Sequence, residues 1–257
     1  MTETEPRSAI VVGGASGIGA AIARALAVDG ATVTVADRNI DQARELASEL
    51  GPDHDAAQVD VTDESSIREL FESVLSTRGR VDIAVNSAGI SVAGAITELP
   101  VEKFRLVVDV CLTGAFLVVK HAGRVMSEGG VIISLSSLNA RQPGTGMSAY
   151  CSAKAGLAML TEVAALELAP RRIRVNAIAP GIVMTPLTSP SMSVPGLEDD
   201  YLDNTPLGRS GTPEEIADAA VYMTHASWLT GESLDLNGGA HLVKYPDLLG
   251  HFRRATA

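Results

Sequence analysis

The sequence predicts an α/β fold, a doubly wound parallel β-sheet with helices on both faces. Short apolar runs rich in β-branched residues alternate with longer stretches of helical spacing, as in buried parallel strands joined by crossover helices. A chain of 257 residues with 46% hydrophobic content can bury one large core. No internal repeat or low-complexity tract interrupts it. We therefore expect a single domain spanning residues 1–257.

The expected strands are runs of about four apolar residues, and the expected helices carry an apolar face at helical spacing. The strand runs are 10–12, 33–36, 83–85, 131–133 and 175–178. The helical stretches are 20–27, 40–50, 64–77, 101–126, 149–168 and 213–223. Within the fourth of these, residues 107–119 are strongly apolar, but Asp109 interrupts them and Lys120 and Arg124 follow. This stretch is too short and too charged to cross a bilayer, so it predicts a core helix about 39 Å long.

The first strand runs into a glycine-rich turn and then a helix. The turn contains Gly13, Ser16, Gly17, Ile18 and Gly19. Glycines leave out the Cβ atoms that would keep a phosphate from the backbone amides, and a helix N-terminus offers unpaired N–H groups. The turn is therefore predicted to cradle a pyrophosphate. Its G-x-x-x-G-x-G spacing is not that of a P-loop, and a tight turn without a ligand is the alternative.

A carboxylate ends the second predicted strand. Asp37 lies at about the distance from the glycines where such folds bind ribose, so it is expected to accept hydrogen bonds from the adenosine hydroxyls. A carboxylate there repels a 2′-phosphate, which favours NAD over NADP. Arg38 follows directly and could pair with that phosphate, so NADP stays open. The alternative for Asp37 is an ordinary surface acid.

Tyr150 and Lys154 lie four residues apart and share one face of a predicted helix. An ammonium about 6 Å from a phenol, at an effective dielectric near 20, favours the phenolate by roughly 3 kcal/mol, or about two pKa units. The pair is therefore predicted to act as a proton donor and acceptor near neutral pH. The alternative is an amphipathic helix with a packed tyrosine and a solvated lysine.

Taken together, the motifs resemble the short-chain dehydrogenase/reductase family along nearly the whole chain. They are the glycine turn, Asp60 and Val61 after the third strand, residues 86–89, Ser137 thirteen residues before Tyr150, the YxxxK pair and residues 180–185. The resemblance implies a Rossmann-like fold with a parallel β-sheet of about seven strands, and a nicotinamide dinucleotide cofactor. It also implies a small-molecule alcohol or ketone substrate.

The resemblance further implies residue roles. Asp60 and Val61 would meet the adenine, and Asn86, Ala88 and Gly89 would line the middle of the cofactor. The nicotinamide amide would be held by residues 180–185, which include Pro180, Gly181, Val183 and Thr185. Ser137 would bind the substrate oxygen, Tyr150 would pass the proton, and Lys154 would lower the tyrosine pKa and bind the ribose. Helix 101–126 would pack against neighbouring subunits in a dimer or tetramer.

One departure from the family pattern bears on the proton path. Cys111 stands where the family usually has an asparagine that helps hold a water between the lysine and solvent. A thiol cannot replace a carboxamide. We hypothesise that the relay persists through the main chain; alternatives are a small buried hydrophobe or a redox role for Cys111 or Cys151. Val12, Ser87 and Asn237 are milder departures.

The substrate is predicted less sharply. Residues 186–212 form a long proline-containing connection without helical period, expected to be a substrate lid, although it could instead cover a subunit contact. Its apolar members and those of nearby loops suggest a mostly apolar secondary alcohol or ketone; they are Leu187, Met192, Val194, Leu197, Tyr201, Leu202, Val92, Leu138 and Met147. The tail 241–257 is too apolar for a free end and is expected to dock on a neighbouring subunit.

Composition excludes several other functions. A formal charge of −11 argues against nucleic acid as a partner. Two cysteines without CxxC spacing and five scattered histidines predict neither a disulfide framework nor a metal site. The first eight residues do not read as a signal peptide, so a reduced cytoplasmic compartment is expected.

The leading functional prediction is an NAD-dependent secondary-alcohol dehydrogenase. An NADPH-dependent 3-oxoacyl thioester reductase is the nearest alternative, and Asp37 argues against it. A cofactor-bound scaffold or sensor with weak chemistry is the alternative of another class, suggested by Cys111.

Overall fold

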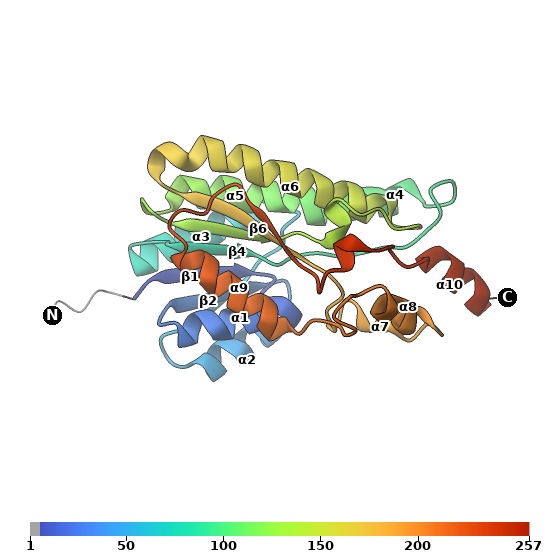
Figure 1. The fold of residues 1–257 in the computed structure, drawn as a ribbon. Helices are drawn as coiled ribbons and strands as arrows, with labels where there is room; N and C mark the ends of the chain where they lie inside the picture. The colour runs from blue at the N-terminus through green and yellow to red at the C-terminus, as the bar shows by residue number, and fades with distance from the viewer. Residues whose placement is uncertain (1–5, 257) are drawn as a thin grey trace.

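The computed structural model describes residues 6–256 and contains one seven-stranded parallel sheet between two layers of helices (Figure 1). The strand order is β3-β2-β1-β4-β5-β6-β7. The strands are β1 Ser8–Val12, β2 Thr32–Asp37, β3 Asp55–Gln58, β4 Ile83–Asn86, β5 Val131–Leu135, β6 Arg174–Pro180 and β7 Ser233–Leu236. The predicted fold class is confirmed. The expectation that no signal peptide begins the chain falls largely on residues 1–5, which lie outside the described residues.

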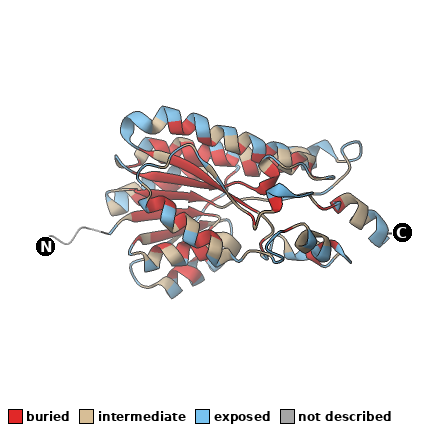
Figure 2. Ribbon diagram, in the orientation of Figure 1, coloured by how far each residue is buried: buried red, intermediate tan, exposed pale blue. Residues whose placement is uncertain are grey.

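The helices cover both faces of the sheet. One face carries α3 Glu64–Arg78, α5 Gly114–Val125 and α6 Ser148–Leu168, and the other carries α1 Gly17–Val28, α2 Ile40–Leu50 and α9 Pro213–His225 (Figure 1). One apolar cluster fills the space between the sheet and each helix layer, and the central strands β1, β2, β4, β5 and β6 are almost wholly buried (Figure 2). Capping residues fix helix starts: Thr212 and Glu215 form a capping box at α9.

The register of the sheet brings the predicted motifs to one edge. Val12, the last residue of β1, lies opposite Ala36 of β2 on one side and Asn86 of β4 on the other. Because the strands are parallel, the glycine turn, Asp37 and the segment after Asn86 leave the sheet side by side. The strand order reverses at β1, and ligands of open α/β sheets bind at such a reversal, beyond the carboxyl ends of the strands.

The predicted helix 101–126 forms as three joined pieces. α4 Val101–Val108 continues into a π-helix at Asp109–Thr113 and then into α5. By length and composition alone, Val101–Val125 could span a membrane, but 56% of its most apolar window is buried inside the protein. Its neighbours are α3 and α6. This burial agrees with a core helix.

The connection 186–212 is not a structureless loop. It contains α7 Ser189–Met192 and α8 Leu197–Asp203. We predicted no helix because proline and an acidic cluster dominate the sequence there. Glu198, Asp199 and Asp200 occupy the first turn of α8, where carboxylates favour a helix because they complement its dipole.

The C-terminal tail packs on its own chain, and its docking on a neighbouring subunit stays a prediction. It ends in α10 Leu248–Thr256. Leu248 packs with Met147, Met192 and Leu197. The apolar pattern of the tail showed that it would be covered, but a pattern cannot say by which surface.

Candidate active site

Ser137 and Tyr150 come from two elements that meet at the carboxyl edge of the sheet. Ser137 follows β5 and caps the short 3-10 turn Leu138–Ala140, where its Oγ accepts a hydrogen bond from Asn139 N at 3.1 Å. Tyr150 lies in the first turn of α6, where the nearby Ser137 hydroxyl acts to lower its pKa. Residues thirteen positions apart in the sequence therefore bring their hydroxyl groups to the same pocket.

Lys154 is buried one helical turn after Tyr150. Its side chain is held by a hydrogen bond from Nζ to Leu135 O at 2.6 Å, and Nζ lies 5.5 Å from the centre of the Tyr150 ring. Burial lowers the pKa of Lys154 because the desolvated ammonium is disfavoured. The two side chains share one helix face, as the spacing of four residues implies.

The expected lowering of the Tyr150 pKa is not found among the protein's own groups. Burial of the phenol raises its pKa, and Cys111 and Cys151 raise it further, whereas the hydrogen bond from Ser137 lowers it. Desolvation penalises the phenolate more than the neighbouring groups favour it. The spacing of Tyr150 and Lys154 predicts that the two groups lie close together, but it says nothing about how deeply they are buried.

Cys111 joins the π-helix to the loop after β4. Its Sγ accepts a hydrogen bond from Ile90 N and donates one to Ile90 O, both at 3.3 Å. A methyl group on Gly89 would lie 3.7 Å from Lys154 Nζ and 3.8 Å from Cys111 Sγ. The thiol therefore lies near Lys154, but its own hydrogen bonds go to the main chain.

A groove of about 550 Å³ runs over the edge of the sheet beside this cluster. Most of the residues predicted to bind the cofactor line it: Gly13, Ser16, Gly17, Ile18, Asp37, Arg38, Asp60, Val61, Ala88, Gly89 and Thr185. The others lie elsewhere. Gly19, Asn86 and Val183 are packed behind the wall, whereas Pro180 and Gly181 line the adjoining pocket.

The glycines of the turn serve two purposes. A Cβ on Gly19 would lie 2.1 Å from Gly13 O, and one on Gly13 would lie 2.6 Å from Ala88 N, so these two glycines let the turn pack on itself. Gly17 faces the groove at φ +51°. Ser16, the N-cap of α1, makes no side-chain hydrogen bond to the helix. The first N–H groups of α1 thus lack a side-chain cap, which fits a pyrophosphate.

Backbone amides fix the Asp37 carboxylate at the end of β2. One oxygen accepts from Ala15 N at 3.1 Å and the other from Asn39 N at 3.0 Å. Further along the groove, hydrogen bonds from Thr62 hold the pKa of Asp60 below its usual value, with a smaller contribution from the charge of Arg38. The groove thus offers a fixed carboxylate at its adenosine end, next to one arginine.

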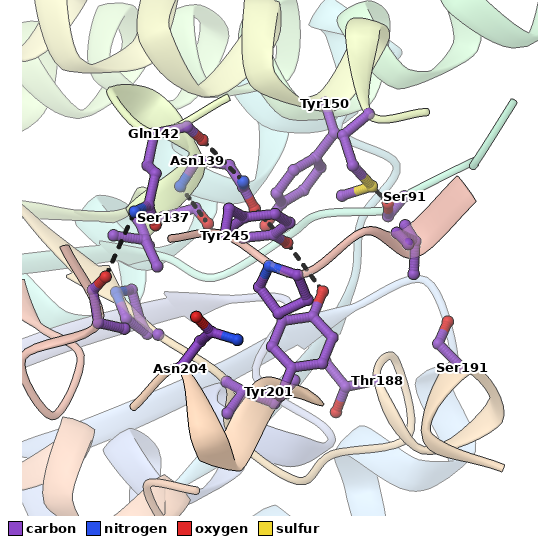
Figure 3. A pocket seen from close by; sticks show the side chains of 18 of the residues that line it. Ser91, Ser137, Asn139, Gln142, Tyr150, Thr188, Ser191, Tyr201, Asn204 and Tyr245 are labelled. Carbon is purple, nitrogen blue, oxygen red and sulfur yellow. Dashed lines mark hydrogen bonds between the residues drawn. The ribbon is translucent and has the colours of Figure 1, made fainter. Parts of the chain in front are cut away.

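A second, smaller pocket of about 150 Å³ opens over Ser137 and Tyr150 (Figure 3). Leu187 lines both this pocket and the groove, so the two cavities adjoin. Several of the expected apolar residues are present: Leu138, Met147, Leu187, Met192 and Tyr201. Val92, Val194, Leu197 and Leu202 do not line it.

This pocket also has a polar wall, which was not predicted from the sequence. Asn139, Gln142, Asn204, Lys244 and Tyr245 line it, and Tyr201 contributes a hydroxyl as well as a ring. These residues come from the turn after β5, the end of α8 and the tail. The one signal in the sequence was a tyrosine in each of two segments, Tyr201 in the connection 186–212 and Tyr245 in the tail, because the chain has only four tyrosines.

The chain matches known proteins along most of its length. Residues 13–241 match a family profile described as enoyl-(acyl carrier protein) reductase. The chain is 35% identical to a 3-oxoacyl-[acyl-carrier-protein] reductase from Homo sapiens, covering 91% of this chain and 97% of that one. It is 38% identical to 3beta-hydroxysteroid dehydrogenase 1 from Eggerthella lenta, covering 93% and 95%. A solved short-chain type dehydrogenase/reductase from Mycobacterium ulcerans superimposes with a TM-score of 0.91 at 33% identity, covering 96% and 94%.

Proposed function

Because the chain belongs to the short-chain dehydrogenase/reductase family and is an oxidoreductase of that family, we propose that it is an NAD-dependent dehydrogenase of secondary alcohols and ketones. One observation carries the proposal. The hydroxyls of Ser137 and Tyr150, with buried Lys154 beside them, line the pocket that adjoins the dinucleotide-sized groove.

Each protein group has a physical role in the proposed reaction. Ser137 Oγ holds the substrate oxygen, and Tyr150 takes the proton of an alcohol or gives it to a forming alkoxide. Lys154, fixed on Leu135 O, supplies positive charge when Tyr150 ionises. A bound nicotinamide supplies the hydride acceptor or donor. Burial raises the pKa of Tyr150, which favours the protonated phenol that reduction needs; oxidation needs the phenolate, which Lys154 and a positively charged nicotinamide would favour.

The proposed cofactor is NAD rather than NADP. The Asp37 carboxylate is held by two backbone amides at the groove. A fixed carboxylate can accept hydrogen bonds from ribose hydroxyls and repels a 2′-phosphate. Asp60, Val61, Ala88 and Gly89 would line the rest of the dinucleotide.

We also propose that the water relay of the family persists in this chain through the main chain near Cys111. The site lies in the π-helix Asp109–Thr113, and π-bulges are frequent at functional sites. The Cys111 thiol is already engaged with both backbone groups of Ile90. Its side chain is therefore not the proposed carrier of the proton.

The second candidate is an NADPH-dependent 3-oxoacyl thioester reductase. The name of the human relative and the family description support it. Asp37 argues against NADPH. A scaffold with weak chemistry is a third candidate, supported only by Cys111.

A homo-oligomer is the proposed assembly, because α4, α5 and α6 expose large apolar side chains to solvent. Leu106, Phe116, Met159, Val163 and Leu166 are each more than 40% exposed. Sedimentation would test this proposal, and a monomer at micromolar concentration would contradict it. The two free cysteines support a reduced compartment such as the cytoplasm.

The test of the function is a cofactor-absorbance assay with NAD and NADP over a panel of secondary alcohols and ketones. Tyr150→Phe should reduce turnover by about a thousandfold or more, because proton transfer by a positioned group commonly contributes two to four orders of magnitude. NADH binding should be unchanged. Tyr222→Phe, which alters a 63% exposed tyrosine on α9, is the matched control. Unchanged turnover in Tyr150→Phe would refute the proposed chemistry.

A further inference from the structure

A chain of hydrogen bonds crosses the wall of the pocket opposite the catalytic hydroxyls. Tyr245 OH lies 3.1 Å from Asn139 Oδ1, and Tyr201 OH lies 2.8 Å from Tyr245 OH. The two rings meet edge to face at 5.7 Å. Figure 3 shows the series from Asn139 through Tyr245 to Tyr201, with Asn204 nearby. This series of hydrogen bonds links the turn after β5, the tail and α8.

The direction of these hydrogen bonds is fixed by the amide of Asn139. Its Nδ2 donates to Gln142 O at 3.0 Å, so its Oδ1 must be the atom that faces Tyr245. Tyr245 therefore donates its only hydroxyl proton to Asn139. Tyr201 must then donate its own proton to Tyr245. Both phenols present only oxygen lone pairs to the rest of the pocket.

Two further side chains of the wall repeat this pattern. Gln142 Nε2 donates to Ala240 O at 3.3 Å and to Val243 O at 2.5 Å, which leaves its buried Oε1 without a donor among residues 6–256. Asn204 Nδ2 donates to Asp200 O at 2.8 Å and to Asp200 Oδ1 at 3.0 Å. The amide protons are engaged in each case, and the amide oxygens are not.

The hydroxyl groups of the wall are also mostly engaged as donors. Thr188 Oγ1 donates to Val183 O at 2.6 Å, and Thr205 Oγ1 donates to Tyr201 O at 2.8 Å. Apart from the catalytic pair, Ser191 and the exposed Lys244 are the remaining donor side chains without a hydrogen bond in the described part of the pocket. The wall is therefore rich in acceptors and poor in donors.

We propose that the substrate carries at least one further hydroxyl group besides the reacting oxygen, and that the acceptor oxygens of Tyr201, Tyr245 and Asn204 bind it. This inference rests on the proposed function and names its substrate class: hydroxyketones and the corresponding diols or polyols. A buried acceptor left without a donor costs free energy, so a ligand that supplies the missing proton is preferred over one that does not.

The charge of the pocket selects a neutral hydroxyl among the possible donors. Burial raises the pKa of both Tyr201 and Tyr245, so they stay neutral phenols. No aspartate or glutamate is among the described residues that line the pocket. An ammonium would therefore be desolvated without a counter-charge. Lys244 is the one charged side chain among the described lining residues, and it is exposed. A carboxylate bound at Tyr201, Tyr245 and Asn204 would place its lone pairs against theirs.

The experiment compares three ketones of matched carbon skeleton: butanone, hydroxybutanone and methoxybutanone. The methoxy compound keeps the oxygen but has no proton to donate. We expect kcat/KM for hydroxybutanone to exceed that for methoxybutanone by about tenfold or more, the value of one hydrogen bond of roughly 1.4 kcal/mol. In Tyr201→Phe this ratio should fall at least fivefold through a rise in KM for hydroxybutanone. Tyr222→Phe is the matched control.

A second measurement does not depend on turnover. The thermal unfolding midpoint of the full chain is recorded with each ketone at equal concentration, with oxobutyrate as a carboxylate probe, because a ligand of the folded state raises the midpoint. Hydroxybutanone should give the largest rise in wild type and lose its advantage in Tyr201→Phe. Equal rises with hydroxybutanone and methoxybutanone, a larger rise with oxobutyrate, or no rise with any of them would overturn the inference. Turnover of none of the ketones with either cofactor would instead refute the proposed function.

Discussion

Asp37, which lines the groove, is predicted to set the preference for NAD over NADP. Asp37→Asn removes the charge but keeps one acceptor oxygen of nearly the same shape. In the structure, the carboxylate is held by Ala15 N and Asn39 N at about 3 Å each. It cannot swing away from a 2′-phosphate without losing both hydrogen bonds.

The magnitude follows from Coulomb's law. A 2′-phosphate carries about −1.5 to −2 charges, and a separation of about 6 Å at an effective dielectric of about 40 gives roughly 2.4 kcal/mol of repulsion. The groove is open to solvent, so a dielectric between those of protein and water is appropriate. Removal of this repulsion should raise kcat/KM for NADP relative to NAD by about fiftyfold.

The assay is the ratio of kcat/KM for the two cofactors with one substrate. Asp41→Asn is the control, since Asp41 lies nearby on α2, is 90% exposed and changes the net charge equally. Asp37→Asn leaves one of the two backbone amides without its acceptor, so we expect a loss of stability of about 1 kcal/mol. A cofactor ratio within twofold of wild type, in a folded variant, would refute the assigned role of Asp37.

Three further predictions concern other parts of the chain. Cys111→Asn should change turnover by less than about tenfold if the water relay uses the main chain. It should also cost about 1 to 3 kcal/mol of stability, because a larger side chain enters a fully buried site. A hundredfold gain in turnover would show that the natural relay is broken. Gly19→Ala should abolish cofactor binding or folding because its Cβ would lie 2.1 Å from Gly13 O, whereas Gly211→Ala, with a nearest contact of 3.4 Å, should be tolerated; normal NADH binding by Gly19→Ala would contradict this. Burial raises the pKa of Tyr201 above its unfolded value, so its contribution to stability is present below about pH 10 and is lost as pH rises further. Urea unfolding should show the free energy of unfolding of the wild type falling relative to that of Tyr201→Phe above about pH 10. The same pH dependence of this free energy in both proteins would contradict the assigned burial.

The central part of the fold was predictable because its signals are local. β1, β4 and β5 are fully buried, so their sequences are continuous apolar runs. The edge strands are different. β3 and β7 are only partly buried and hold polar residues such as Gln58 and Asp235, so no apolar run marked them. Their presence was expected only from the family resemblance.

The candidate site was predictable in its members but not in its electrostatics. The spacing of Tyr150 and Lys154 determines that they share a helix face, whereas burial, which raises the tyrosine pKa, depends on elements far away in the sequence. The polar wall was missed for a similar reason. Whether Asn139 offers a proton or a lone pair depends on Gln142 O and Tyr245, and only coordinates bring these together.

The C-terminal tail lines the pocket over Ser137 and Tyr150 but does not line the groove. Asp247 of the tail accepts a hydrogen bond from Thr145 at 2.8 Å, and His251 contacts Asp200 of α8 at 3.0 Å. The last helix of the chain is thus held to the loop before α6 and to α8, and no described residue of the tail lines the groove. We therefore expect a truncation or fusion at the carboxyl terminus to reshape the pocket over Ser137 and Tyr150 while leaving the groove intact.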